Sequence, residues 1–85
     1  MSDNGSDIKA IMREFFRNNF LYSSDIDSIS DDTSFMNEGI IDSTGVLELL
    51  DFIEERFGID IENGEVIPEN LDSFNNIERF LRTKL

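Results

Sequence analysis

The chain of 85 residues contains no cysteine and no histidine. These absences exclude disulfide bonds, cysteine nucleophiles, ordinary zinc sites and every catalytic arrangement that pairs serine or cysteine with histidine. No apolar run is long enough to span a bilayer, and the first residues, MSDNGSD, are polar and acidic, unlike a secretory signal. We therefore expect a cytoplasmic protein with no membrane segment and no metal site.

Basic residues are scarce. Seven Lys and Arg side chains stand against 19 Asp and Glu side chains, which gives a formal net charge of −12. This charge argues against electrostatic binding to nucleic acid or to an anionic membrane, and it predicts partners with basic surfaces. Between residues 37 and 65 the only base, Arg56, accompanies nine acids: Glu38, Asp42, Glu48, Asp51, Glu54, Glu55, Asp60, Glu62 and Glu65. Taken alone, this bias also fits a solvated face that only keeps a small protein soluble.

Large apolar side chains are sufficient for folding, since 39% of the residues are hydrophobic and eight are phenylalanine. A chain of this length forms a single domain, residues 1–85, and a deep enzyme pocket is not expected. Apolar residues at helical spacing predict a first helix over residues 7–20, capped by Ser6 or Asp7. Its inward residues are Ile8, Ile11, Met12, Phe15 and Phe16.

Residues 21–42 form a long connection that is rich in Ser, Thr and Asp. We expect a short helical turn near residues 26–29, and four apolar anchors that hold the connection against the helices: Ile26, Ile29, Phe35 and Ile40. The spacing of Asp25, Asp27 and Asp31 superficially resembles a calcium loop. The glycine and the final glutamate of an EF-hand are not at the required positions, which argues against calcium.

Residues 43–57 give the clearest helical pattern. Its inward residues are Val46, Leu49, Leu50, Ile53 and Phe57, and its outward acids are Glu48, Asp51, Glu54 and Glu55. Gly58 is expected to end this helix, and Pro68 to start a short helical turn. A last helix is predicted over residues 73–84, with Phe74, Ile77, Phe80 and Leu81 inward. The expected fold class is all-α, a small antiparallel bundle of three main helices plus a short one, with a long loop between the first two.

The segment GIIDSTGVLELL, residues 39–50, places an Asp-Ser pair between an apolar turn and the second long helix. On the residues alone, Ser43 either caps this helix or offers an exposed hydroxyl to which a group can be attached. The longer segment SFMNEGIIDSTGVLELLDFIEERFGIDI, residues 34–61, resembles the acyl carrier protein and peptidyl carrier protein family. Looser similarity in the first and last helices extends the resemblance over nearly the whole chain.

The resemblance implies that a phosphopantetheinyl transferase moves 4′-phosphopantetheine from coenzyme A onto Ser43, beside Asp42. The terminal thiol of that group would hold acyl or aminoacyl intermediates as thioesters, and the chain itself would not be an enzyme. The implied partners are the transferase, a loading ligase, and downstream synthase or transferase enzymes with basic docking surfaces; a monomer is expected. The implied docking residues are Thr44, Glu48, Asp51, Glu54 and Glu55.

The sequence departs from the family pattern at two places. Thr44 stands where leucine is usual, and Gly45 after it should weaken the first helical turn. The segment ENGEVIPEN, residues 62–70, is long for a region that commonly lines the cargo cavity in this family. Phe52, Phe57 and Phe74 could partly fill such a cavity, although apolar residues at helical spacing are more often plain core. These departures indicate a specialised freestanding carrier rather than a housekeeping role in fatty acid synthesis. The pathway stays open among fatty acid, polyketide and nonribosomal peptide biosynthesis.

Two other functions compete with the carrier hypothesis. An acidic interaction module or nucleic-acid mimic, with Ser43 only a helix cap, fits the net charge equally well. It does not explain a glycine and two isoleucines before an exposed serine. A small hydrolase with paired carboxylates is disfavoured, because the acids lie on one outward face and no cleft is evident.

Overall fold

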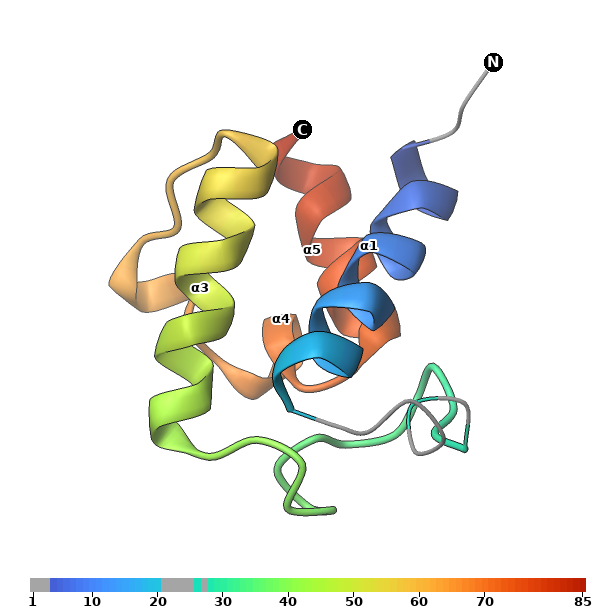
Figure 1. The fold of residues 1–85 in the computed structure, drawn as a ribbon. Coiled ribbons are helices and arrows are strands. Elements are labelled where there is room, and N and C mark those ends of the chain that lie inside the picture. Colours follow the sequence, from blue (N-terminus) through green and yellow to red (C-terminus); the bar gives the residue numbers. More distant parts are fainter. Residues whose placement is uncertain (1–3, 21–25, 27) are drawn as a thin grey trace.

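The computed structural model describes residues 4–20, 26 and 28–85, and within this part of the chain the secondary structure is helical, without strands (Figure 1). The main helices are α1 (Asn4–Asn19), α3 (Ser43–Phe57) and α5 (Phe74–Lys84). A 3-10 helix, η1 (Asn63–Glu65), and a short helix, α4 (Pro68–Leu71), lie between α3 and α5. In Figure 1, α1 runs opposite to α3 and α5. The predicted fold class is therefore confirmed.

Helix α1 begins earlier than predicted. It starts at Asn4, so Ser6 and Asp7 lie within the helix and the expectation that one of them caps it was wrong. Acidic and small polar residues are tolerated in a first turn, where the helix dipole favours negative charge, so their presence does not mark the boundary. The helix ends at Asn19, and the Phe20 amide donates to the Phe16 carbonyl at 2.8 Å.

The end of α3 and the start of α4 follow the predicted signals, and α5 begins one residue after the predicted start. Gly58 adopts a left-handed conformation, φ 67°, and its amide donates to the Glu54 carbonyl, which ends α3. Pro68 occupies the first turn of α4, where its missing amide hydrogen is not needed. Ser73 caps α5, because its hydroxyl accepts a hydrogen bond from the Asn76 amide at 3.0 Å.

Three phenylalanines form the centre of the core. Phe16 of α1, Phe35 of the long loop and Phe74 of α5 are fully buried, and their ring centroids lie 4.5 to 5.1 Å apart. Such ring contacts add to the stabilisation that comes from apolar burial. Between α1 and α3, Phe15 stacks on Phe52 with ring centroids 4.1 Å apart. The aromatic contacts therefore connect all three main helices and the loop.

The long loop is anchored as predicted. Ile26 and Phe35 are fully buried, and Ile29 and Ile40 are half-buried and pack against the core. Ile41, which the sequence pattern did not single out, is buried as well. The helical turn expected near residues 26–29 includes residue 27, and both that residue and Asp25 lie outside the described residues.

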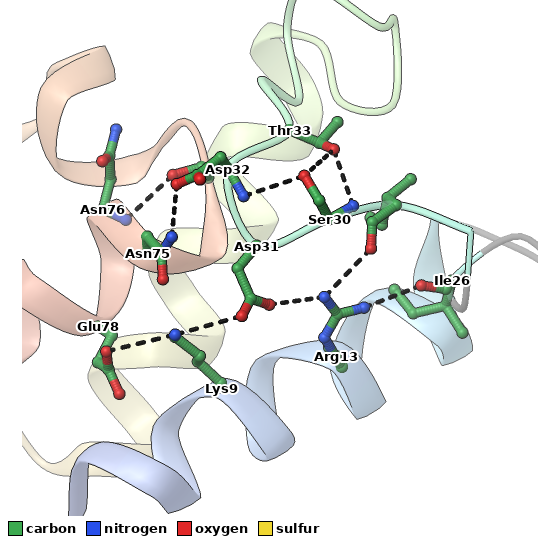
Figure 2. Close-up of polar contacts among 12 residues, drawn as sticks. Lys9, Arg13, Ile26, Ser30, Asp31, Asp32, Thr33, Asn75, Asn76 and Glu78 are labelled. Atoms are coloured by element: carbon green, nitrogen blue, oxygen red, sulfur yellow. Dashed lines mark hydrogen bonds and ion pairs between the residues drawn. The ribbon is translucent and has the colours of Figure 1, made fainter.

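A network of polar contacts fixes the loop to α1 (Figure 2). The Arg13 guanidinium donates to the Ile26 carbonyl at 2.9 Å, to the Ile29 carbonyl at 3.2 Å and to Asp31 Oδ1 at 2.7 Å. Lys9 lies between Asp31 and Glu78 of α5, with nitrogen to oxygen distances of 3.3 and 3.7 Å. We call Lys9, Arg13, Asp31 and Glu78 the loop clamp.

Asp72, between α4 and α5, holds the next part of the loop. Its backbone carbonyl accepts from the Phe35 amide at 2.9 Å, and its carboxylate accepts from the Met36 amide at 2.9 Å and from the Ser34 hydroxyl. The Asn75 amide also donates to the Asp31 carbonyl at 3.0 Å. These bonds place the end of the loop beside α4, directly before the segment that contains Ser43.

Candidate functional site

The chain reverses direction just before Ser43. Gly39 has φ 69°, a backbone conformation that residues with a Cβ atom rarely adopt. Its backbone amide donates to the Met36 carbonyl at 3.2 Å. The Ile40 amide then donates to the Phe35 carbonyl at 2.8 Å. The turn buries Ile41 and leaves the next two residues exposed. The glycine and two isoleucines of the motif therefore present Asp42 and Ser43 on the surface.

Asp42, not Ser43, caps α3. Asp42 has an extended conformation, and its Oδ1 accepts from the Gly45 amide at 2.8 Å. Its backbone carbonyl accepts the first helical bond, from the Val46 amide at 2.9 Å. Ser43 is thus the first residue inside the helix. The interpretation of Ser43 as the helix cap was wrong, because the neighbouring carboxylate performs that role.

The Ser43 side chain is exposed. Within the described part of the chain, its hydroxyl makes no hydrogen bond. The amides of Ser43 and Thr44 precede the first bonds of a 15-residue helix, and such amides together with the helix dipole favour an anion. A phosphodiester on the Ser43 oxygen would therefore lie in a favourable electrostatic environment, and the residues present fit such a group.

Gly45 has a packing role that the sequence did not reveal. It is buried, and a Cβ atom at this position would lie 2.5 Å from Ile41 Cγ1 and 3.2 Å from a ring carbon of Phe20. Contacts that short require a neighbour to move. Gly45 therefore allows the turn before Ser43 and the end of α1 to pack closely on the first turn of α3. Thr44, the other departure from the family pattern, is exposed.

The predicted docking acids differ in their surroundings. Glu48, Asp51 and Glu55 are exposed, and no ion pair to another described residue involves them. Glu54 is half-buried, and its Oε2 accepts from the Ile61 amide at 2.8 Å, so this carboxylate also fixes the segment after α3. We call the three exposed acids the acidic face of α3. Arg56 is the one base in α3, and it lies over the Phe57 ring at 5.7 Å.

Comparison with known families agrees with this geometry. The family model for the phosphopantetheine attachment site matches residues 7–81. The chain belongs to this family. It is a carrier domain whose cofactor is covalently attached 4′-phosphopantetheine. No curated protein matches the sequence closely.

The carrier has a small cavity of about 80 Å³ beside the first turns of α3. Ile41 and Val46 line it on either side of Ser43 in the sequence, and Val66, Ile67 and Pro68 line it from the segment after α3. Residues of the segment ENGEVIPEN therefore line this cavity. Phe74 is fully buried in the core, and Phe52 and Phe57 are half-buried and pack against it, as expected for the alternative that they are plain core residues.

The cavity-lining segment is fixed to α5 by an ion pair. Lys84 Nζ lies 2.9 Å from Glu65 Oε1, and this hydrogen bond lowers the pKa of Glu65 and raises the pKa of Lys84. The Glu62 amide also donates to Glu65 Oε1 at 3.0 Å. Glu65 thus holds η1 against the last turn of α5.

Two further observations concern a membrane segment and a metal site, neither of which the sequence predicts. Among the described residues, no helix is long and apolar enough to cross a membrane. The same part of the chain contains no group of His, Cys, Asp or Glu side chains arranged to hold a metal ion. Asp25 and Asp27, two members of the aspartate pattern considered for calcium, lie outside it.

Proposed function

We propose that Ser43 is the attachment residue for 4′-phosphopantetheine and that the chain carries acyl or aminoacyl groups between partner enzymes. The observation that carries this proposal is the division of roles at the start of α3. Asp42 caps the helix, and the neighbouring Ser43 hydroxyl is exposed and makes no hydrogen bond to any residue that the structure describes. A serine needed only for folding would not be expected to lack such a bond.

The attachment is a phosphoryl-type transfer from coenzyme A. A bond forms between Ser43 Oγ and the phosphorus that bears the pantetheine, and the bond from that phosphorus to the adenosine bisphosphate half of coenzyme A breaks. The hydroxyl proton passes to a base of the transferase. The exposed position of Ser43 and the backbone amides of Ser43 and Thr44, which precede the first hydrogen bonds of α3, favour the developing anion. When bound, 4′-phosphopantetheine supplies a thiol that holds the cargo as a thioester.

The carrier contributes delivery and no catalytic step of its own. A tethered cargo reaches the active site of a docked enzyme at high effective concentration without any added affinity. The acidic face of α3 begins one turn after Ser43 and fits basic surfaces on a transferase, a loading ligase and downstream enzymes. Charge complementarity of this kind favours fast association and leaves docking brief.

Intact-mass spectrometry tests the proposal directly. The protein is incubated with coenzyme A and a broad-specificity phosphopantetheinyl transferase, in parallel with Ser43→Ala and with Ser30→Ala, an exposed serine of the loop. We expect one added phosphopantetheinyl group on the wild type and on Ser30→Ala, and none on Ser43→Ala.

Two results would contradict the proposal. Modification of Ser43→Ala would place the attachment elsewhere. A folded wild type that several active transferases leave unmodified would favour the acidic interaction module, with the acidic face as its binding surface.

A further inference from the structure

The turn that presents Ser43 depends on residues 34–36 of the loop. The amides of Ile40 and Ile41, which come directly before the Asp-Ser pair, both donate to the Phe35 carbonyl, at 2.8 and 3.4 Å. The amides between them also bond to this stretch: Asn37 to the Ser34 hydroxyl, Glu38 to the Ser34 carbonyl and Gly39 to the Met36 carbonyl. A residue that fixes residues 34–36 therefore also fixes the backbone that leads to Ser43.

Asp72 bonds all three residues of this stretch. Its backbone carbonyl accepts from the Phe35 amide, and Oδ1 of its carboxylate accepts from the Met36 amide, both at 2.9 Å. Oδ2 accepts from the Ser34 hydroxyl. Three consecutive residues of the loop are thus bonded to a single residue that lies 36 to 38 positions later in the chain.

The position of Asp72 is itself fixed by two helices. Its amide donates to the Pro68 carbonyl at 2.9 Å, which ends α4. The next residue, Ser73, is buried and caps α5, and Phe74 after it is fully buried in the core. A side chain on such a support has little freedom to move, so its carboxylate is a rigid acceptor for the loop.

The buried ring of Phe35 and the carboxylate of Asp72 have different effects on the loop. The Phe35 ring is fully buried, with its centroid 4.5 Å from that of Phe16 and 5.0 Å from that of Phe74. Burial of this ring keeps the loop attached to the core, but a single ring does not fix the direction of the backbone on either side. The carboxylate bonds the residues before and after Phe35, and so it fixes that direction.

We propose that Asp72 is a positioning residue for the attachment of 4′-phosphopantetheine to Ser43. It acts through the turn, which it holds in the conformation that presents the hydroxyl. This inference rests on the attachment at Ser43 proposed above. A small misplacement of a reacting group slows a reaction strongly. Loss of the carboxylate should therefore slow transfer, while the acidic face of α3 still allows docking.

Single-turnover kinetics of the full chain with coenzyme A and a broad-specificity phosphopantetheinyl transferase test this inference. The maximal rate constant reports transfer, and the transferase concentration that gives half of that rate reports docking. Asp72→Ala keeps the backbone bond to Phe35 and loses both carboxylate bonds. We expect its maximal rate constant to fall about tenfold, and its half-saturating concentration to change by less than about twofold.

Two further variants separate position from charge. Asp72→Asn removes the charge but keeps an oxygen that can accept from the Met36 amide and an NH₂ group that can donate to the Ser34 hydroxyl, so it should keep most of the rate constant. Asp32→Ala is the matched control, because it removes an exposed carboxylate that bonds the loop to Asn75 of α5 (Figure 2). It should react like the wild type.

Amide hydrogen exchange measures the turn without the transferase. We expect the amides of Ile40 and Ile41 to exchange faster in Asp72→Ala than in the wild type, and at the wild-type rate in Asp32→Ala. If Asp72→Ala does not fold, Ser34→Ala removes one of the two carboxylate bonds and should show smaller changes of the same kind in both measurements.

Three results would overturn the inference. A variant Asp72→Ala with a lower midpoint of thermal unfolding, Tm, but a wild-type rate constant would show that Asp72 only stabilises the fold. An Asp72→Asn as slow as Asp72→Ala would show that charge, and not the bonds to the turn, controls transfer. Unchanged exchange at Ile40 and Ile41 would show that the turn does not depend on Asp72. A wild type that gains no mass contradicts the attachment at Ser43 itself, and the positioning role then fails with it.

Discussion

The loop clamp and the acidic face of α3 are both rich in charge, but they use it differently. In the clamp, Asp31 bonds Arg13 and Lys9, and Lys9 also pairs with Glu78 (Figure 2). On the acidic face, Glu48 and its neighbours point to solvent and have no ion pair with a described residue. Charge that is satisfied internally fixes the loop, whereas unsatisfied charge of one sign is available to a partner.

The two regions also differ in what holds them together. The clamp depends on hydrogen bonds from a charged guanidinium to carbonyls and a carboxylate, and Arg13 also lies 4.6 Å above the Phe74 ring. The start of α3 depends on close apolar packing around Gly45 and on one capping bond from Asp42. Removal of a side chain should therefore destabilise the loop clamp, whereas addition of a side-chain atom should destabilise the start of α3.

Removal of the clamp arginine should have the largest effect. Arg13→Ala leaves the carbonyls of Ile26 and Ile29 and the Asp31 carboxylate without this donor. We expect the free energy of unfolding to fall by about 2–3 kcal/mol. Urea denaturation measures it. The matched control is Arg79→Ala, which removes an exposed arginine of α5 that donates two hydrogen bonds. Its free energy of unfolding should fall by less than half as much. Equal losses would show that the clamp has no special role.

Addition of one methyl group at Gly45 should have the next largest effect. An exposed helical glycine usually gains stability on replacement by alanine, by up to about 1 kcal/mol. At Gly45 the added Cβ would lie 2.5 Å from Ile41 Cγ1, so we expect Gly45→Ala to lose about 1–3 kcal/mol. Thermal unfolding shows whether Gly45→Ala is less or more stable than the wild type. Thr44→Ala, at the exposed preceding position, is the control and should change stability little. A stabilised Gly45→Ala would contradict the packing argument.

Arg13 and Gly45 have roles that the sequence alone did not predict. Helical periodicity and the boundary signals at Gly58 and Pro68 predicted the later helices to within a residue, because such signals depend on neighbours along the chain. The role of Arg13 depends on contacts 13 to 18 residues away, and the role of Gly45 depends on where Phe20 and Ile41 come to lie. No local pattern contains such information.

The same limit applies within the candidate site. The Asp-Ser pair predicted one helix cap and one exposed hydroxyl. Because Asp and Ser both cap helices, a shift of the helix start by one residue would exchange the roles of Asp42 and Ser43. Only the bond from the Gly45 amide to Asp42 Oδ1 assigns the cap to Asp42. The structural role of Glu54 was missed for a similar reason, because its partner Ile61 follows a turn after the helix.

Charge reversal on the acidic face should change kinetics and leave stability unchanged. In the double variant Glu48→Lys with Glu55→Lys, we expect phosphopantetheinyl transfer to slow about tenfold at low salt, since steering depends on the sign of the local charge. The difference from wild type should shrink as salt is added. The control is Glu14→Lys with Glu69→Lys, which makes the same change of net charge on α1 and α4. If both variants slow equally, net charge and not the acidic face controls docking.

The smallest effect concerns the pH dependence of the clamp. The hydrogen bond from Arg13, opposed by partial burial and aided by Lys9, lowers the pKa of Asp31 below its ordinary value of 3.8. The folded state thus favours the ionised carboxylate more than the unfolded chain does. The resulting stabilisation is fully present above pH 3.8 and is lost as the pH falls from that value through the lower pKa of the folded state.

Comparison of wild type with Asp31→Asn isolates this contribution. We expect the wild type to be the more stable protein at neutral pH, and the difference in Tm to narrow only below about pH 4. Glu38→Gln, which neutralises an exposed carboxylate of the same loop, is the control and should show no comparable narrowing. A difference between wild type and Asp31→Asn that stays constant down to pH 2 would mean that Asp31 acts by shape alone. The clamp would then owe its strength to the two hydrogen bonds from Arg13 to backbone carbonyls, and it would differ from the acidic face by these hydrogen bonds rather than by paired charges.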